Sequence, residues 1–263
     1  MVGQDQEIDF SAGFAAAIAD REAQQIQEQL NEPEPPVDFG SDAPANHISP
    51  AAYDLIVQHE TGGRSYYEKV YKGRPVWPGA QSGITIGFGY DLGYYSSDTF
   101  KSDWSALPPA IIGRLLPSIG LHGGKMPDAQ LKQLVQDLRD ISISWDTAQT
   151  VFRTTTLPVY ATKTWNSLPN CEGLPSDCFG ALVSITFNRG NSYSIPPEKD
   201  PTNRYAEMRD IKSAMTRSAF AEIPALMRSM ERIWHGTAIA QEMTSRREQE
   251  AALFEAALAT TQS

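Results

Sequence analysis

The stretch SGITIGFGYDLG, residues 82–93, decides the fold of this chain. Its β-branched and aromatic residues favour strands, and its glycines allow a turn or the close approach of another group. It carries the hydroxyl of Thr85 and the carboxylate of Asp91. Because these positions differ by an even number, six, both side chains would point to the same face of a regular strand.

A helix that carries a carboxylate in its last turn is predicted just upstream. Ser49 suits the N-cap and Pro50 the first helical position, apolar residues follow at helical spacing, and Gly62 can end the helix. Glu60 then lies at the C-terminal end of this helix. The sequence therefore predicts a carboxylate that faces the following β structure.

Residues 66–92 are predicted to form a small hairpin. YYEKVY (66–71) and ITIGFGYDL (84–92) are the expected strands, joined by the loop KGRPVWPGAQSG (72–83). From Ser97 onward the pattern predicts helices, and Pro158 is expected to break or kink one of them. The expected helices span 108–116, 127–141, 145–165, 176–188, 203–215, 219–234 and 238–258. The predicted fold class is α+β: one helix, a small hairpin lobe and a mostly helical lobe.

The charge of the chain is concentrated at its N-terminus. The formal charge is −10, and residues 1–45 hold ten acidic and one basic side chain, which leaves about −1 for residues 46–263. No basic face suggests nucleic acid binding, and no apolar run approaches the roughly 18 residues that span a bilayer. We therefore expect neither nucleic acid nor a membrane as a partner.

Two regions are predicted from composition. Residues 1–45 form an acidic, partly helical arm with a Pro-rich linker, and residues 46–263 form the main domain. The first residues, MVGQDQEIDF, lack a basic segment followed by an apolar one, so we expect synthesis in the cytoplasm without a signal peptide. The arm is either a solvated tail or a docking segment for a partner.

The cysteine and histidine residues predict no cofactor and no metal. Cys171 and Cys178 lie seven apart in a loop-like stretch, either as two unrelated thiols or as a loop-closing disulfide formed after export. The four histidines are scattered, and no four-ligand set for zinc is in sight.

Glu60, Thr85 and Asp91 together suit the cleavage of a glycosidic bond. One carboxylic acid must protonate the leaving oxygen, and a second group must position water or attack the sugar. Each residue alone has an ordinary explanation: a solvated Glu at a helix end, a Thr with β propensity, and an Asp at a turn. Their combination is what favours a catalytic site.

Glu60 followed by TIGFGYDLG resembles the active-site region of phage-type lysozymes. The order Glu, Thr, Asp is most similar to the pesticin-like branch, which occurs in bacterial toxins and muramidase effectors. FGALVSITFNRG (179–190) is similar to the helix of this superfamily that ends beside the cleft, and SRREQEAALF (245–254) resembles its C-terminal arginine-pair helix. The resemblance covers residues from roughly 50 to 255.

The resemblance implies a muramidase with a lysozyme-like fold and a cleft between its lobes. Glu60 would protonate the bond between N-acetylmuramic acid and N-acetylglucosamine, Asp91 would stabilise the transition state or activate water, and Thr85 would position that water. An inverting mechanism is implied. Asn188 and Arg189 would line the cleft, although Asn188 also suits a helix C-cap. Arg246 and Arg247 are expected to form structural ion pairs with neighbouring glutamates.

Two further residues are candidates for substrate binding. Trp77, in the long loop, could stack on a sugar ring or simply pack. Glu68 lies eight residues past Glu60, near the position of the Asp of ordinary phage lysozymes, and is a competing second carboxylate. We rank it below Asp91, because the residues around Asp91 match the family motif and those around Glu68 do not.

Two alternatives stay open: a lytic transglycosylase, which uses a lone Glu, and a catalytically silent wall-binding module. The expected partner is peptidoglycan, reached in the periplasm or cell wall after lysis or secretion. The pesticin-like resemblance favours an antibacterial toxin or secreted effector over a phage endolysin. An immunity protein or a secretion component could then bind the arm, residues 1–45. We expect a monomer.

Overall fold

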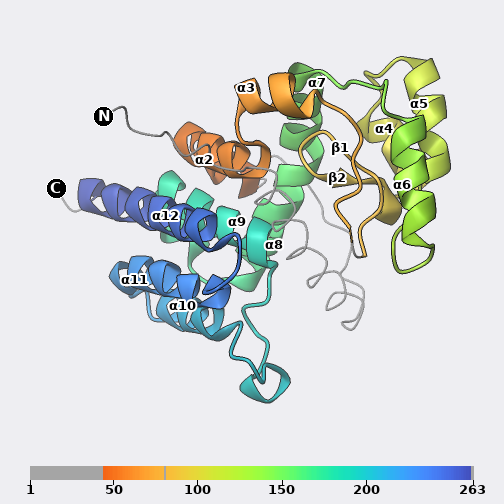
Figure 1. Ribbon diagram of the computed structural model, residues 1–263. Helices are drawn as coiled ribbons and strands as arrows, with labels where there is room; N and C mark the ends of the chain where they lie inside the picture. The colour runs from red at the N-terminus through yellow and green to blue at the C-terminus, as the bar shows by residue number, and fades with distance from the viewer. Residues whose placement is uncertain (1–43, 80, 262–263) are drawn as a thin grey trace, which may run out of the picture.

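The computed structural model describes residues 44–79 and 81–261, which form two groups of helices with a small sheet in one of them (Figure 1). The described chain is mostly helical and carries one two-stranded antiparallel sheet, so the α+β prediction is confirmed in this coarse form. The predicted arm lies outside the described residues except for its last two positions. No described helix is both long and apolar enough to cross a bilayer.

The first group of elements surrounds the sheet. It comprises α3 (Arg64–Tyr66), the π-helical η2 (Tyr67–Tyr71), β1 (Thr85–Ile86), β2 (Tyr90–Asp91), η3 (Leu92–Tyr94), α4 (Ser97–Asp103), α5 (Pro109–Leu115), η4 (Leu116–Ser118) and α6 (Asp128–Asp137). A long helical segment leads to the second group; it comprises α7 (Trp145–Val151), the π-helical η5 (Phe152–Thr156) and α8 (Leu157–Ser167).

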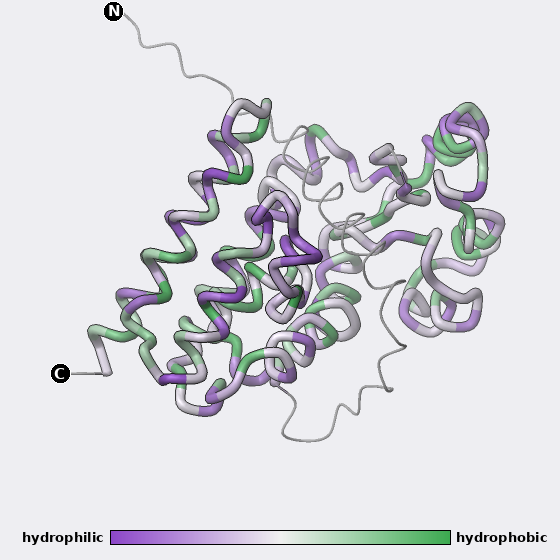
Figure 2. Tube along the Cα trace, turned by 90° about the horizontal axis from the view of Figure 1, so that it is seen from below, coloured by the Kyte–Doolittle hydropathy of each residue, from purple (hydrophilic) through white to green (hydrophobic). Residues whose placement is uncertain are grey.

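The second group is built around α9. It comprises η1 (Pro44–His47), α2 (Pro50–Thr61), η6 (Cys171–Gly173), α9 (Ser176–Arg189), η7 (Pro197–Lys199), α10 (Ala206–Thr216), η8 (Phe220–Glu222), α11 (Ile223–Ser229), η9 (Met230–Trp234) and α12 (Ala240–Thr261). Helices α2, α8 and α12 pack against α9, which is buried from Cys178 to Arg189. Polar and apolar residues alternate along the outer helices, as expected of elements with one buried face (Figure 2).

Helix α2 begins and ends where the sequence predicts. The Ser49 hydroxyl accepts a hydrogen bond from the Ala52 N–H at 3.0 Å, and Pro50 occupies the first turn. Gly62 ends the helix with φ 71°, a left-handed conformation that glycine adopts without strain. Glu60 therefore lies in the last turn, as predicted.

The predicted strand at residues 66–71 is wrong, because this segment is helical. Tyr67 and Tyr71 are four apart and their rings lie 5.4 Å from each other, which is a helical contact. The hairpin is instead contained within the opening stretch, where β1 pairs with β2. Gly87 and Gly89, with φ of 57° and 82°, make the turn between them.

Pro158 does not break the long helical segment. It lies in the first turn of α8, directly after the π-helical η5. A π-helical turn changes the hydrogen-bond register, so the chain can continue as a helix past a residue that has no N–H to donate.

Cys171 and Cys178 are both free and buried thiols. Their sulfur atoms donate to different carbonyl oxygens, those of Leu168 and Phe254, each at 3.3 Å. Burial raises the pKa of each thiol to about 12, with smaller contributions from the neighbouring acidic side chains. Of the two interpretations left open by the sequence, the structure shows unrelated thiols.

We expect both cysteines of the folded protein to resist alkylation at neutral pH, because the thiolate is the reactive form. Intact-mass measurement after iodoacetamide treatment should show no adduct under native conditions and two adducts after treatment in denaturant without a reductant. Two adducts appearing only after reduction would instead indicate a disulfide.

Candidate active site

Glu60 is held in the interior at the end of α2. It is 3% exposed, and its Oε1 accepts a hydrogen bond of 2.9 Å from Nη1 of Arg246 on α12. Helix α2 can approach α9 closely because residue 180 is glycine; a Cβ there would lie 2.2 Å from the Cβ of Ala52. Close packing of α2, α9 and α12 thus places this carboxylate.

Glu60 belongs to a buried ion cluster. The expected ion pairing of Arg246 and Arg247 with a neighbouring glutamate is confirmed for Glu250, whereas the participation of Glu60 was not predicted. Arg246 also donates from Nε to Oε1 of Glu250 at 3.1 Å, and from Nη2 to the carbonyl and hydroxyl oxygens of Ser184. Arg247 donates to Glu250 Oε1 at 2.9 Å. Glu60, Glu250, Arg246 and Arg247 form what we call the ion cluster. The sequence signal was the spacing of Arg246, Arg247 and Glu250 on one helix face, but nothing in it pointed to Glu60.

The ion cluster influences the ionisation of its neighbours. Burial lowers the pKa of Arg246, but Glu60 and Glu250 outweigh this, so that the pKa lies above its usual value. Burial, followed by the positive charges of Arg246 and Arg247, lowers the pKa of His59 to about 3. His59 is therefore neutral at ordinary pH.

Thr85 and Asp91 face each other across the hairpin. They are register partners of β1 and β2, so the expectation that both lie on one strand is wrong. Their side chains nevertheless share a face, because directly opposed residues of an antiparallel pair point the same way. The Thr85 hydroxyl is buried and has no hydrogen-bond partner among the described residues.

Backbone N–H groups orient the Asp91 carboxylate. Gly83 donates to Oδ1 and Oδ2 at 3.1 and 3.0 Å, and Gly93 donates to Oδ1 at 2.8 Å. Two N–H donors that make three contacts with a carboxylate suit its ionised form. Neither glycine can be replaced freely, because a Cβ on either would lie within 3.0 Å of Asp91 Oδ1. The glycines of the motif thus form a cradle for the carboxylate.

We expect Gly83→Ala to lower the activity proposed below by about ten- to a hundredfold, since small displacements of a reacting group are costly. The new Cβ would lie 2.6 Å from both Asp91 Oδ1 and the Leu121 carbonyl oxygen, so the carboxylate must move. Gly113→Ala is the matched control, because a Cβ there meets open space. Equal rates for the two variants would contradict a role for the cradle.

Aromatic contacts fix the hairpin relative to the helix that carries Glu60. Phe88, at the hairpin turn, contacts the Tyr67 ring at 5.4 Å and the Phe152 ring at 5.7 Å. Phe152 also contacts Tyr53 of α2 at 6.2 Å and Phe187 of α9 at 5.6 Å. One buried aromatic group therefore links the hairpin, α2, η5 and α9.

Trp77 and Glu68, the other two predicted site residues outside α9, lie in different parts of the structure. The Trp77 indole donates to the Ser82 carbonyl at 2.9 Å, next to the Asp91 cradle, with Lys132 Nζ 5.7 Å from its ring centroid. Glu68 lies on the exposed surface of η2, where Arg64 Nε donates to it at 2.8 Å. Trp77 thus belongs to the hairpin region, whereas Glu68 belongs to a surface ion pair.

Asn188 and Arg189 are buried at the end of α9. Asn188 does not cap the helix, because the helix runs to Arg189 and Gly190 takes that position. The Arg189 guanidinium lies over the rings of Tyr205 and Trp234, at 5.2 and 5.5 Å, and Trp234 also lies under Arg247 of the ion cluster, at 5.8 Å. Arg189 thus shares an aromatic partner with the ion cluster.

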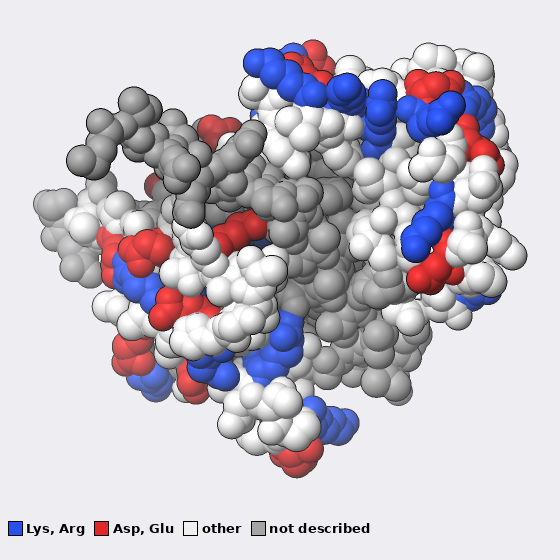
Figure 3. All heavy atoms as spheres, in the orientation of Figure 1, with Lys and Arg blue, Asp and Glu red and all other residues white. Residues whose placement is uncertain are grey.

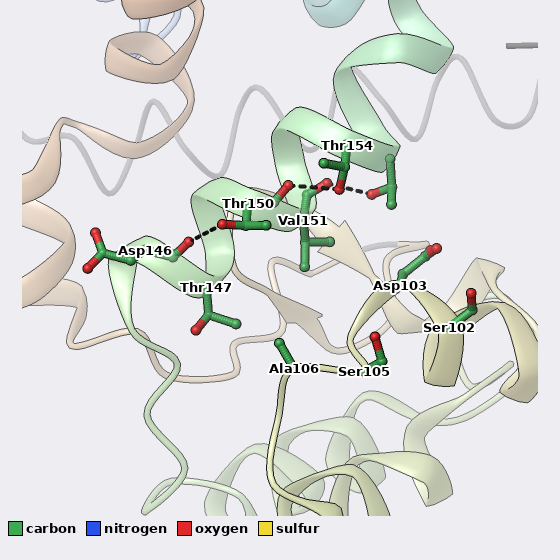
Figure 4. Close-up of a pocket in the computed structure, with 10 residues that line it drawn as sticks. Ser102, Asp103, Ser105, Ala106, Asp146, Thr147, Thr150, Val151 and Thr154 are labelled. Atoms are coloured by element: carbon green, nitrogen blue, oxygen red, sulfur yellow. Dashed lines mark hydrogen bonds between the residues drawn. The ribbon is translucent and has the colours of Figure 1, made fainter. Parts of the chain in front are cut away.

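A separate surface groove of about 510 Å³ lies between α4 with its following loop and the α7–η5 segment (Figure 4). It is lined by Ser102, Asp103, Ser105, Ala106, Asp146, Thr147, Thr150, Val151, Thr154 and Thr155. The hydroxyls of Thr150, Thr154 and Thr155 donate to carbonyl oxygens one turn earlier, so these donors are already in use. None of the predicted site residues lines this groove.

Comparison of the chain with protein-family models, with curated proteins and with solved structures finds no match. In the described part of the chain, no group of three or more His, Cys, Asp and Glu side chains is placed to hold a metal ion. The geometry of the chain's own side chains is therefore the structural basis for a functional proposal.

Proposed function

We propose that this protein is a peptidoglycan muramidase that hydrolyses the β-1,4 bond between N-acetylmuramic acid and N-acetylglucosamine. The observation that carries the proposal is the hairpin arrangement of Thr85 and Asp91: register partners, with the carboxylate held by two glycine N–H groups. A buried carboxylate on the preceding helix, Glu60, supplies the second acidic group that glycoside hydrolysis requires.

The roles of the three residues follow from their surroundings. Glu60, shielded from water, donates a proton to the glycosidic oxygen as general acid. Asp91, fixed by N–H donors, holds the attacking water on the opposite face of the sugar. The Thr85 hydroxyl, which is buried and without a hydrogen-bond partner among the described residues, completes the hydrogen bonding of that water. An inverting outcome is the stereochemistry that we propose.

Asp91 is favoured over Glu68 as the second carboxylate. The Asp91 side chain faces a buried hydroxyl and is oriented by the backbone, whereas Glu68 is in a solvent-exposed ion pair on a helix. A group that must hold water in one position benefits from fixed geometry, and an exposed ion pair supplies little of it.

Muropeptide analysis tests the reaction. Purified peptidoglycan digested by the wild-type chain should yield reducing sugar ends, while 1,6-anhydro ends would indicate a lytic transglycosylase. Asp91→Asn should lose most of the activity, and Glu68→Gln should keep it. The reverse pattern would make Glu68 the second carboxylate. Peptidoglycan that the wild-type chain leaves uncleaved would instead favour a silent wall-binding module.

The nearly neutral charge of residues 46–263 bears on how the wall is bound. Basic and acidic side chains are interspersed over the described part of the face in Figure 3, rather than gathered into one basic area. We infer that affinity for the anionic wall comes from specific sugar contacts, with Trp77 beside the Asp91 cradle as a candidate. An antibacterial toxin or secreted effector is the biological role that we propose, with the acidic arm available for docking.

A further inference from the structure

The ion cluster brings two glutamate carboxyl groups and two guanidinium groups into contact. All four side chains are buried, and Glu250 is 0% exposed. Its Oε1 accepts three hydrogen bonds, from the Ser184 hydroxyl at 2.5 Å, from Arg246 and from Arg247. Its Oε2 has no partner among the described residues. Two of the three donors to Glu250 thus belong to the ion cluster.

Arg246 is shared between the two carboxylates. It donates from Nη1 to Glu60 at 2.9 Å and from Nε to Glu250 at 3.1 Å. Arg247 adds a second positive charge on the side of Glu250. Because charges interact strongly in a buried site, the charge on Glu250 changes how strongly the arginines favour the ionised form of Glu60.

We propose that Glu250 is a positioning residue that sets, through Arg246, the pH range in which Glu60 holds its proton. The inference rests on the proposed function, in which Glu60 must be protonated to act. With Glu250 ionised, the positive charge of the arginines is divided between two carboxylates. When the Glu250 carboxylate is removed, the positive charge of the two arginines acts on Glu60 alone, and Glu60 loses its proton at lower pH.

Two other titratable groups of the described chain interact with the ion cluster, His59 on α2 and Tyr193 after α9. Neither titrates between about pH 4 and 9. The pKa of His59 is lowered to about 3 by burial and by the two arginines, and burial raises the pKa of Tyr193 above its usual value. A change in the pH profile across this range can therefore be assigned to the carboxylates.

Two single variants unbalance the cluster in opposite directions. Glu250→Gln should move the alkaline limb of the pH–activity profile to lower pH by about one unit, and Arg247→Gln should move it to higher pH by a similar amount. The double variant restores the balance and should return the limb towards the wild-type position. Because the expected pH shifts of the two single variants have opposite signs, either variant tests the proposal even if the other fails to fold.

Two control variants separate charge from packing. Ser184→Ala removes the hydroxyl that binds both Glu250 and Arg246 but changes no charge, so the limb should stay in place. Glu248→Gln neutralises an exposed glutamate of the same helix, which pairs with Arg228, and should also leave the limb unchanged. A shift in Ser184→Ala equal to that in Glu250→Gln would overturn the proposal.

The closing experiment has a readout that does not need activity. Carbon-13 NMR titration of the Glu60 side-chain carboxyl, assigned by its absence in Glu60→Gln, should give midpoints in the order Glu250→Gln, wild type, Arg247→Gln. Shifted midpoints without muramidase activity would reject the proposed function and keep the inference. Unchanged midpoints in an active enzyme would reject the inference and keep the function.

Discussion

Replacing Glu60 by glutamine is expected to lower the rate of peptidoglycan hydrolysis by about 10²- to 10⁴-fold, the usual contribution of a general acid. The amide has nearly the same shape and its oxygen can still accept the hydrogen bond from Arg246, but it has no proton to give at the glycosidic oxygen. Release of reducing ends per unit time measures the loss, and the melting temperature measures whether the fold is kept.

A matched exchange separates the loss of a proton donor from a change of charge. Glu172→Gln alters an exposed glutamate in η6, far from the hairpin motif in sequence, and should leave the rate at the wild-type value. If Glu60→Gln hydrolyses peptidoglycan as fast as wild type, Glu60 is not the acid and the muramidase proposal fails in its present form.

Removing Arg246 is expected to have the largest effect on stability. Arg246→Met leaves Glu60 and Glu250 buried without their shared cation, and breaking a buried ion pair in this way costs about 3–5 kcal/mol. For a domain of this size the melting temperature should fall by about 10 °C. Urea unfolding of the two proteins, followed by circular dichroism, gives the difference in unfolding free energy directly.

Arg228 provides the matched control on the surface. It binds both Glu248 and Glu255 at 2.6–3.0 Å, yet these partners are more than half exposed. Exposed pairs contribute about 0–1 kcal/mol, so Arg228→Met should have a small effect although it also removes the contacts with two carboxylates. Equal losses for the two variants would mean that burial does not determine the contribution of Arg246.

The boundaries of α2 could be predicted because the signals are local. Ser49, Pro50 and Gly62 satisfy or replace the unpaired backbone groups at the helix ends, and each acts within one turn. The position of Glu60 in the last turn follows directly. The helical identity of residues 66–71 could not be predicted in this way, since a short apolar run fits a helix or a strand equally well. Packing of Tyr67 against Phe88 and Trp145 accompanies the helical form.

The pairing of Thr85 with Asp91 could be predicted from the sequence only in part. The sequence correctly indicated a shared face, but placed both residues on one strand. The left-handed conformations of Gly87 and Gly89 turn the chain between them and make the residues cross-strand partners. The role of Gly83 as a donor to Asp91 depends on that turn, because it requires the two segments to lie side by side.

The sequence by itself determined the helix that carries Glu60 in its last turn, the helical character of most of the chain and the glycine-rich stretch that holds Thr85 and Asp91. These features depend on backbone preferences and on periodicity within a few residues. Only the tertiary structure decided that Arg246, 186 positions away, binds Glu60 and shares its charge with Glu250. No local pattern encodes that contact, because it forms only when α2, α9 and α12 pack together and bury the charges between them.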